Sequence, residues 1–199
     1  MRRIESALRA IVADLRTLDR SFALLGGFAV SARTDPRTTK DVDVAVVVDD
    51  DADAEQLAFQ LSQRGYQVRT TIEQTSTGRL ATIRTISPRG AIVDVLFASS
   101  GIEPEIVAAA TDIDILDGLI VPVATTGHLI AMKVLARDDR DRPQDRLDLR
   151  ALFAVATADD IDSARAALEL IAARGYSRGR ELLAELARAM SELHGRSIS

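Results

Sequence analysis

Two aspartates inside an apolar run constrain the fold of this chain more than any other feature. Asp41 and Asp43 alternate with valines in the run 41–48, a pattern typical of a β-strand. Residues two apart on a strand point to the same face, so the two carboxylates project together. Paired carboxylates repel each other and raise each other's pKa, which is costly on an apolar strand unless a cation lies between them. Mg²⁺ suits this arrangement, because it binds one or two carboxylates together with phosphate oxygens.

A glycine pair and a third aspartate support a site of this kind. Gly26-Gly27 lies between an apolar run at 22–25 and a helix predicted to start near Phe28. Glycines let backbone N–H groups approach a phosphate closely, and a helix N-terminus adds a favourable potential. Asp94 interrupts the apolar run 92–96. If that strand neighbours the first, Asp94 completes the metal site or takes the proton from an attacking hydroxyl.

Two simpler interpretations remain open at this stage. Asp41 and Asp43 could lie on a solvated edge strand. Asp94 could be a buried acid with ordinary hydrogen-bond partners.

These residues together resemble the polymerase-beta-like nucleotidyltransferase superfamily. The matching pattern is Gly26-Gly27, then Asp41-Val42-Asp43, then Val93-Asp94-Val95. A basic-Thr-x-x-Asp segment begins at Arg37 and leads into the aspartate pair. This form resembles the AbiEii/AbiGii-type toxins, which are minimal nucleotidyltransferases of bacterial toxin–antitoxin systems.

The resemblance continues into the helical part of the chain, to about residue 150. It implies that Lys133 contacts the triphosphate and that Asp148, in an Asp145-x-x-Asp148 segment, orients the lysine or the nucleotide. It also implies a basic residue between them, at Arg137 or Arg140. Gln144 stands where the family often has a basic residue, so Arg140, Arg142 and Arg146 receive no individual role. Solvent-exposed positions for Lys133, Asp145 and Asp148 are the alternative.

The segment before Asp41 carries further candidates. The resemblance implies that Thr39 and Lys40 contact the nucleotide, and that Thr39 is a possible site of regulatory phosphorylation. A phosphate there would repel an incoming triphosphate. Arg33, Arg37 and Lys40 are candidates for contact with phosphates of a nucleic-acid acceptor, although ordinary surface roles are equally compatible with the sequence.

The activity implied by the resemblance is Mg²⁺-dependent transfer of NMP from an NTP to an acceptor. The implied acceptor is the 3′ end of tRNA, which would block translation, and the implied protein partner is a cognate antitoxin. Transfer to a protein or to a small molecule such as an antibiotic is the alternative reaction. A non-catalytic nucleotide-binding protein is the alternative of a different class.

The element pattern predicts an α/β fold followed by a C-terminal helical bundle, and the resemblance implies that the α/β part is of the polymerase-beta-like type, with a mixed sheet and flanking helices. Strands and helices are mixed up to residue 124, and from residue 125 the pattern is helical only, at about 126–137, 144–156, 160–173 and 177–194. We therefore expect a nucleotidyltransferase domain over residues 1–124 and a helical domain over residues 125–199.

Composition narrows the class of protein. The 199 residues include no cysteine and carry a net charge of −5, with no apolar run long enough for a membrane span. We therefore expect a cytoplasmic protein without disulfides and without membrane contact.

Three other motifs are not expected to bind metal. Asp112 and Asp114 repeat the Asp-x-Asp spacing, but Asp117-Gly118 marks them as one arm of a hairpin. The cluster Asp49, Asp51 and Asp53 lacks the glycine and glutamate that a calcium loop requires. His128 and His194 are too far apart in sequence for a histidine metal site and are assigned to helix-surface or capping roles.

Overall fold

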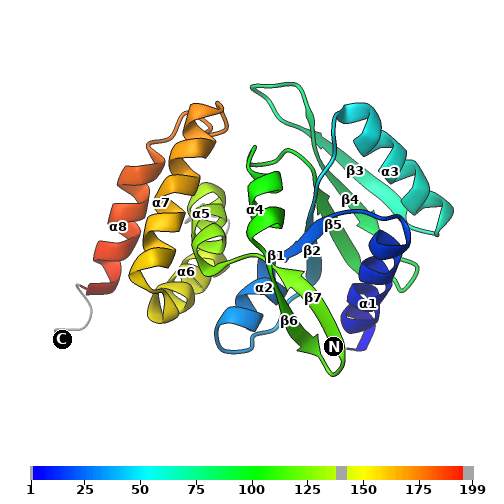
Figure 1. Cartoon of the computed structure of the whole chain (residues 1–199), viewed down its shortest axis with the longest axis horizontal. Helices are drawn as coiled ribbons and strands as arrows, with labels where there is room; N and C mark the ends of the chain where they lie inside the picture. Colours follow the sequence, from blue (N-terminus) through cyan, green and yellow to red (C-terminus); the bar gives the residue numbers. More distant parts are fainter. Residues whose placement is uncertain (1, 138–142, 195–199) are drawn as a thin grey trace.

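A seven-stranded mixed sheet forms the centre of the computed structural model, which describes residues 2–137 and 143–194. The strand order is β3-β4-β5-β2-β1-β7-β6 (Figure 1). The strands are β1 (Phe22–Leu25), β2 (Asp41–Val46), β3 (Gln67–Glu73), β4 (Leu80–Ile86), β5 (Ile92–Leu96), β6 (Thr111–Leu116) and β7 (Leu119–Val123).

Strand β2 lies in the interior of the sheet, antiparallel to β1 and parallel to β5. Val42 and Val44 are fully buried, whereas Asp41 and Asp43, on the other face, are partly exposed. The interpretation of these aspartates as residues of an edge strand is therefore wrong. The edges of the sheet are β3 and β6.

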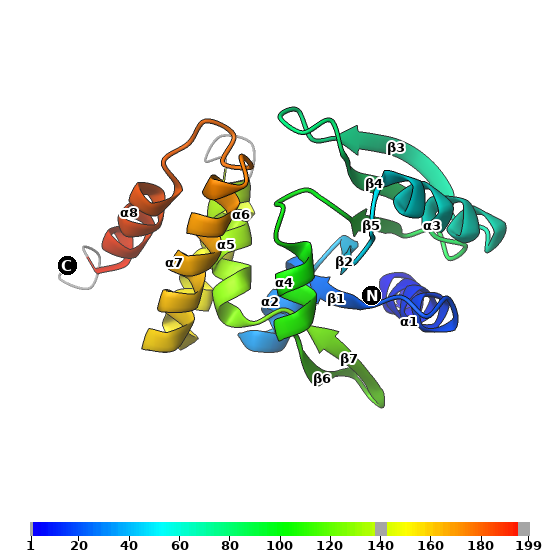
Figure 2. The ribbon, with the colours of Figure 1, turned by 45° about the horizontal axis from the view of Figure 1, so that its top comes forward.

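Helices cover both faces of the sheet. Helices α1 (Arg2–Thr17) and α3 (Asp51–Gln63) lie together on one face, and α2 (Gly26–Arg33) and α4 (Glu103–Ala109) lie on the other (Figure 2). The helical periodicity of α1 buries Leu8, Ile11 and Leu15 against the sheet.

The acidic cluster before α3 caps that helix. Asp50 is the N-cap residue, and its Oδ1 accepts a hydrogen bond from the backbone N–H of Asp53 at 2.9 Å. Asp53 forms an ion pair with Arg20 at 2.7 Å, and Asp51 forms one with Arg79 at 3.2 Å. These acids therefore have structural partners, in agreement with the rejection of a calcium loop.

The C-terminal third is helical, as predicted. It contains α5 (Thr126–Ala136), α6 (Pro143–Val155), α7 (Ala158–Ala173) and α8 (Leu182–His194). Helix α5 is largely buried and contacts the other three, as well as α2. Gly127 allows α5 and α7 to pack closely, because a Cβ there would lie 2.7 Å from the Asp160 carbonyl oxygen. The division into two domains at residue 124 remains a prediction.

One helix boundary differs clearly from the prediction. The last helix begins at Leu182 and not near residue 177, because Arg178 and Gly179 have positive φ angles of 58° and 71°. Arg180 then extends back to the end of α5, where it donates hydrogen bonds to the carbonyl oxygens of Val134 and Leu135 at 3.0 and 2.7 Å. The irregular segment thus supplies donors to carbonyl groups in the last turn of α5, of which that of Val134 also accepts from the backbone N–H of Arg137.

The hairpin prediction is confirmed, since Asp112 and Asp114 lie on β6 paired with β7. Among the described helices, none is both long and apolar enough to cross a membrane.

Candidate active site

Strand register brings three carboxylates together. In the parallel pair β2·β5, Asp43 stands directly opposite Asp94. Asp41, Asp43 and Asp94 each offer a carboxylate oxygen, and these oxygens lie within 4.8 Å of one another. The expectation that the strand of Asp94 neighbours that of Asp43 is therefore confirmed. Asp94 is also buried with a partner of its own, because Arg84 of β4 binds it through two contacts.

The surroundings of the cluster shift the pKa of Asp43. The pKa of Asp43 is raised to about 7, first by burial and then by the negative charges of Asp41 and Asp94, against the opposing charges of Lys133 and Arg84. A cation among the three carboxylates would relieve this repulsion.

The glycine pair makes room for two side chains of the site. A Cβ at Gly26 would lie 1.8 Å from Asp43 Oδ2, and a Cβ at Gly27 would lie 2.4 Å from Thr39 Oγ1. Gly26 also has a positive φ of 59° and starts α2, whose N-cap residue Leu25 makes no side-chain capping bond. The pair thus accommodates Asp43 and Thr39, and its contact with a phosphate remains a prediction.

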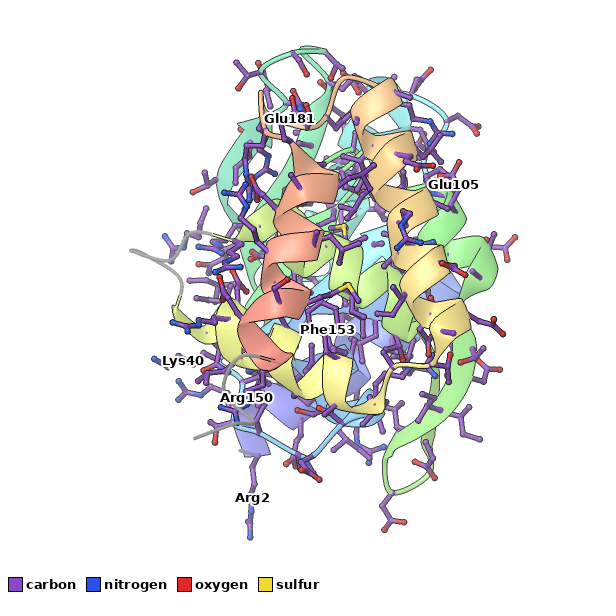
Figure 3. All side chains as sticks on the ribbon, turned by 90° about the vertical axis from the view of Figure 1, so that its left-hand side faces the viewer. Arg2, Lys40, Glu105, Arg150, Phe153 and Glu181 are labelled. Carbon is purple, nitrogen blue, oxygen red and sulfur yellow. The ribbon has the colours of Figure 1, made fainter. Side chains whose placement is uncertain are left out.

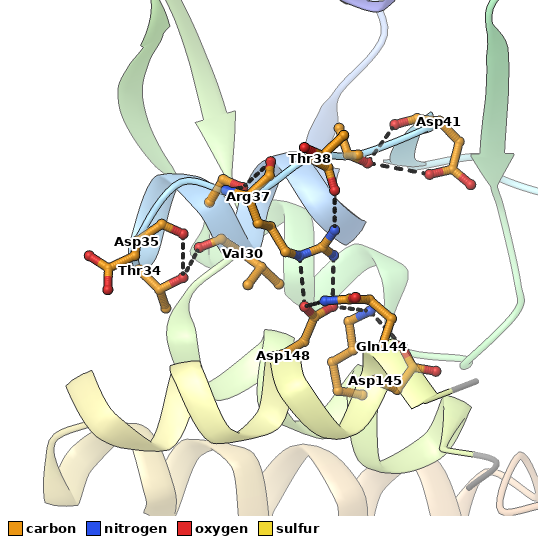
Figure 4. Close-up of polar contacts among 12 residues, drawn as sticks. Val30, Thr34, Asp35, Arg37, Thr38, Asp41, Gln144, Asp145 and Asp148 are labelled. Atoms are coloured by element: carbon orange, nitrogen blue, oxygen red, sulfur yellow. Dashed lines mark hydrogen bonds and ion pairs between the residues drawn. The ribbon is translucent and has the colours of Figure 1, made fainter. Parts of the chain in front are cut away.

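Lys133 of α5 lies in a buried ionic network with two acids of α6, Asp145 and Asp148, which are labelled in Figure 4. Its Nζ donates to Asp145 Oδ1 at 2.7 Å and lies 2.8 Å from Asp148 Oδ2. Burial opposes the charged form of Lys133, but the two carboxylates outweigh it, so its pKa is raised. Asp145 and Asp148 are 6% and 1% exposed, so the interpretation of a solvated helix face is wrong.

Asp148 also joins α6 to the segment that precedes β2. Arg37 contacts it twice, with Nη2 2.7 Å from Oδ2 and Nε 2.7 Å from Oδ1, and Gln144 Nε2 donates to Oδ1 at 3.0 Å. Burial alone would raise the pKa of Asp148, but the hydrogen bonds from Lys133 and Gln144 and the charge of Arg37 lower it. The carboxylate is thereby saturated with donors, which suits an orienting role.

The residues between Arg37 and Asp41 line the same region. Thr39 Oγ1 donates to the Asp41 carbonyl oxygen at 3.2 Å and lies 3.5 Å from Asp41 Oδ1. Lys40 is exposed and projects from the surface (Figure 3). Arg33 instead donates to the carbonyl oxygens of Val123 and Ala124, so its guanidinium is used within the fold.

The basic residues after Lys133 lie farther along the helices. Arg137 and Arg146 both pair with Glu192 of α8, at 3.0 and 3.7 Å. Arg140 and Arg142 lie outside the described residues. His128 is buried, with Nδ1 2.9 Å from the N-cap hydroxyl of Thr125, and burial lowers its pKa. This agrees with a capping role and not with a surface one. His194 ends α8, and its side chain lies outside the described part.

Sequence comparison then identifies the family. The family model described as nucleotidyl transferase AbiEii toxin, type IV TA system, matches residues 7–196. The chain belongs to the AbiEii nucleotidyltransferase toxin family. This confirms the resemblance inferred from the motifs and extends it to the helices after residue 150. A search of curated protein sequences finds no match.

Solved structures confirm a nucleotidyltransferase fold. An antigenic nucleotidyltransferase-like protein from Paracoccidioides brasiliensis is similar over 92% of each chain, with 17% identity and a TM-score of 0.53. The lincosamide antibiotic adenylyltransferase LnuA, bound to lincomycin, is similar over 76% of this chain and 98% of its own, with 12% identity and a TM-score of 0.50. At these identities the likeness concerns the fold alone.

Three contacts of the candidate site were not found from the sequence. Arg84 binds Asp94, Arg37 binds Asp148, and Asp145 binds Lys133 together with Asp148. The second carboxylate oxygen of Asp145, Oδ2, is buried and has no hydrogen-bond partner among the described atoms. The only signal for Arg84 was a charged residue within the largely apolar run 80–86. Its pairing depends on the β4·β5 register, which a single strand does not specify.

Replacement of Gly26 tests the close approach of Asp43. We expect Gly26→Ala to lower the free energy of unfolding by about 1 to 3 kcal/mol more than Gly118→Ala, because its Cβ overlaps Asp43. Both glycines have positive φ, but a Cβ at Gly118 meets nothing within 4 Å. Urea unfolding measures the difference, and equal losses for the two variants would show that no overlap exists.

The pKa of Asp43 predicts a pH dependence of stability in the metal-free protein. Because the folded state holds this proton more tightly than the unfolded state, stability from Asp43 is present below pH 4 and is lost as pH rises to about 7. As pH rises across this window, we expect the free energy of unfolding of Asp43→Asn to increase relative to that of the parent, by on the order of 1 to 4 kcal/mol. Urea unfolding in EDTA from pH 4.5 to 8 measures it, and a pH-independent difference would contradict the shift.

Proposed function

We propose that this protein transfers NMP from an NTP to an acceptor hydroxyl in a Mg²⁺-dependent reaction, and that the acceptor is the 3′ end of tRNA. The observation that carries the reaction is the convergence of Asp41, Asp43 and Asp94, set by the register of β2 and β5. Membership of the AbiEii family supports nucleotidyl transfer. The acceptor rests on the resemblance to toxins of this kind.

The three carboxylates fit a divalent cation by their chemistry. They supply hard oxygen ligands within 4.8 Å of one another, and the pKa of Asp43 is raised first by burial and then by the negative charges of Asp41 and Asp94. We assign Asp41 and Asp43 as the residues that would hold Mg²⁺. When bound, Mg²⁺ would neutralise charge on the phosphates and on the attacking and leaving oxygens.

The other residues bind and orient the nucleotide. The first backbone N–H groups of α2, at Gly26 and Gly27, face no capping side chain and suit a phosphate oxygen. Lys133 is held charged by its two aspartates and would balance the negative charge of the triphosphate. Asp148 orients Lys133, and Thr39 and Lys40 flank the nucleotide.

In the reaction, the acceptor oxygen forms a bond to the α-phosphorus and the bond to the pyrophosphate oxygen breaks. The proton of the acceptor hydroxyl passes to the carboxylate of Asp94, which Arg84 holds in place. Pyrophosphate leaves.

The partners and location follow from the same proposal. A toxin of this family implies a cognate antitoxin, and a tRNA acceptor implies action in the cytoplasm. Transfer to a protein or to a small molecule is the alternative outcome of the acceptor experiment.

That experiment incubates the protein with each α-³²P-labelled NTP and a mixture of total RNA and protein. We expect label on tRNA. We also expect Asp41→Ala to lower the rate of labelling at least 100-fold, because even residues that only support a metal ligand lower activity by up to about 100-fold when they are replaced. Asp112→Ala is the matched control, because it has the same Asp-x-Asp spacing on the hairpin strand β6. Label on protein alone would refute the tRNA acceptor. If cells that express Asp41→Ala stop growing as fully as cells that express the parent, a catalytic function is refuted.

The proposed regulation at Thr39 is tested by a negative charge. A charge beside Asp41 would repel the triphosphate, so we expect Thr39→Glu to weaken NTP binding by roughly ten-fold or more. Thr38→Glu is the control, because Thr38 is exposed whereas Thr39 contacts Asp41. Isothermal titration calorimetry with the NTP gives both affinities. Equal affinities for the two variants would exclude an electrostatic switch at Thr39.

A further inference from the structure

Arg84 binds Asp94, the third carboxylate of the cluster. It stands opposite Asp94 in the antiparallel pair β4·β5, and its guanidinium forms a two-point contact. Arg84 Nε lies 2.9 Å from Asp94 Oδ1, and Nη2 lies 2.6 Å from Oδ2. Such paired contacts are among the strongest side-chain hydrogen bonds, so both oxygens of Asp94 are engaged.

Asp41 and Asp43 differ from Asp94 in this respect. Among the described residues, Asp41 Oδ1 has one long contact, 3.5 Å from Thr39 Oγ1, and no side chain donates a hydrogen bond to the Asp43 carboxylate. Lys133, the other nearby cation, is bound to Asp145 and Asp148. Two carboxylates of the cluster are therefore open to a cation, and the third already has a cationic partner.

The charges in the cluster lead to the same conclusion. Three ionised carboxylates carry three negative charges, and Arg84 supplies one positive charge directly on Asp94. The remainder equals the charge of one divalent ion. A second divalent ion at Asp94 would have to displace the guanidinium or lie close to it, which Coulomb repulsion opposes.

We propose that Arg84 takes the place of a second divalent cation, so that the protein itself holds one ion, on Asp41 and Asp43. This inference rests on the proposed metal-dependent transfer and adds to it the number of ions and the part played by Arg84. Arg84 is then a positioning residue that fixes Asp94 and keeps it from binding metal. The competing role for Arg84 is that of a hydrogen-bond donor that orients Asp94 as a metal ligand.

The number of bound Mn²⁺ ions separates these roles without a measurement of activity. Electron paramagnetic resonance follows free Mn²⁺ during titration of the purified full chain. It also reports whether two bound ions are coupled, because ions that share a carboxylate cluster interact magnetically. We expect one uncoupled ion in the parent and two coupled ions in Arg84→Met.

Arg79→Met is the matched control. Arg79 is also an arginine paired with an aspartate, Asp51, with similar exposure to Arg84, at 38% and 47% for the two side chains. It should bind one ion, like the parent. Replacement of Arg84 leaves the buried Asp94 carboxylate without this partner, so a thermal melt first checks that Arg84→Met is folded, and the ion count of the parent tests the inference on its own.

The remaining outcomes each overturn a stated claim. Two ions in the parent, or one or none in folded Arg84→Met, would overturn the inference, and the proposed transfer would stand. No ion in the parent would overturn the proposed metal site, and the inference would fail with it.

Discussion

Repulsion among three carboxylates is the constraint on which the rest of the site depends. Register forces Asp43 against Asp94, and the Asp-x-Asp spacing adds Asp41. The surroundings respond with fixed positive charge, through Arg84 on one side and Lys133 on the other. Gly26 has no side chain, and the Asp43 carboxylate occupies the space that a Cβ there would fill. The negative charge that remains on the cluster is what a bound cation would balance.

A second ionic network joins distant parts of the chain. Asp148 on α6 binds Lys133 of α5 and also Arg37, which lies just before the strand of the aspartates. Asp148 is almost fully buried, so removal of one partner would leave an uncompensated buried charge. The network therefore fixes the segment that carries Thr39 relative to the C-terminal helices, and places residues more than a hundred positions apart in one site.

Most helices and strands could be predicted from the sequence because the patterns that indicate them are local. Alternating valines marked β2, helical periodicity marked α1, and the Asp117-Gly118 turn marked the β6–β7 hairpin. The start of α8 was missed because Arg178, a residue type that ordinarily favours helix, has a positive φ, and because Arg180 contacts the end of α5, which is distant in sequence. Arg84 and Arg37 were missed as partners because strand neighbours and helix packing decide which charges meet.

The sequence by itself determined the chemical character of the site. Two carboxylates on one face of a strand, a glycine pair before them and a lone lysine in an apolar helix indicate metal and phosphate chemistry, because side-chain periodicity is a local property. The tertiary structure alone decided which of these groups have partners. It paired Asp94 with Arg84, Lys133 with two aspartates, and Gly26 with the Asp43 side chain. Such pairings depend on strand register and on the packing of helices from the far end of the chain.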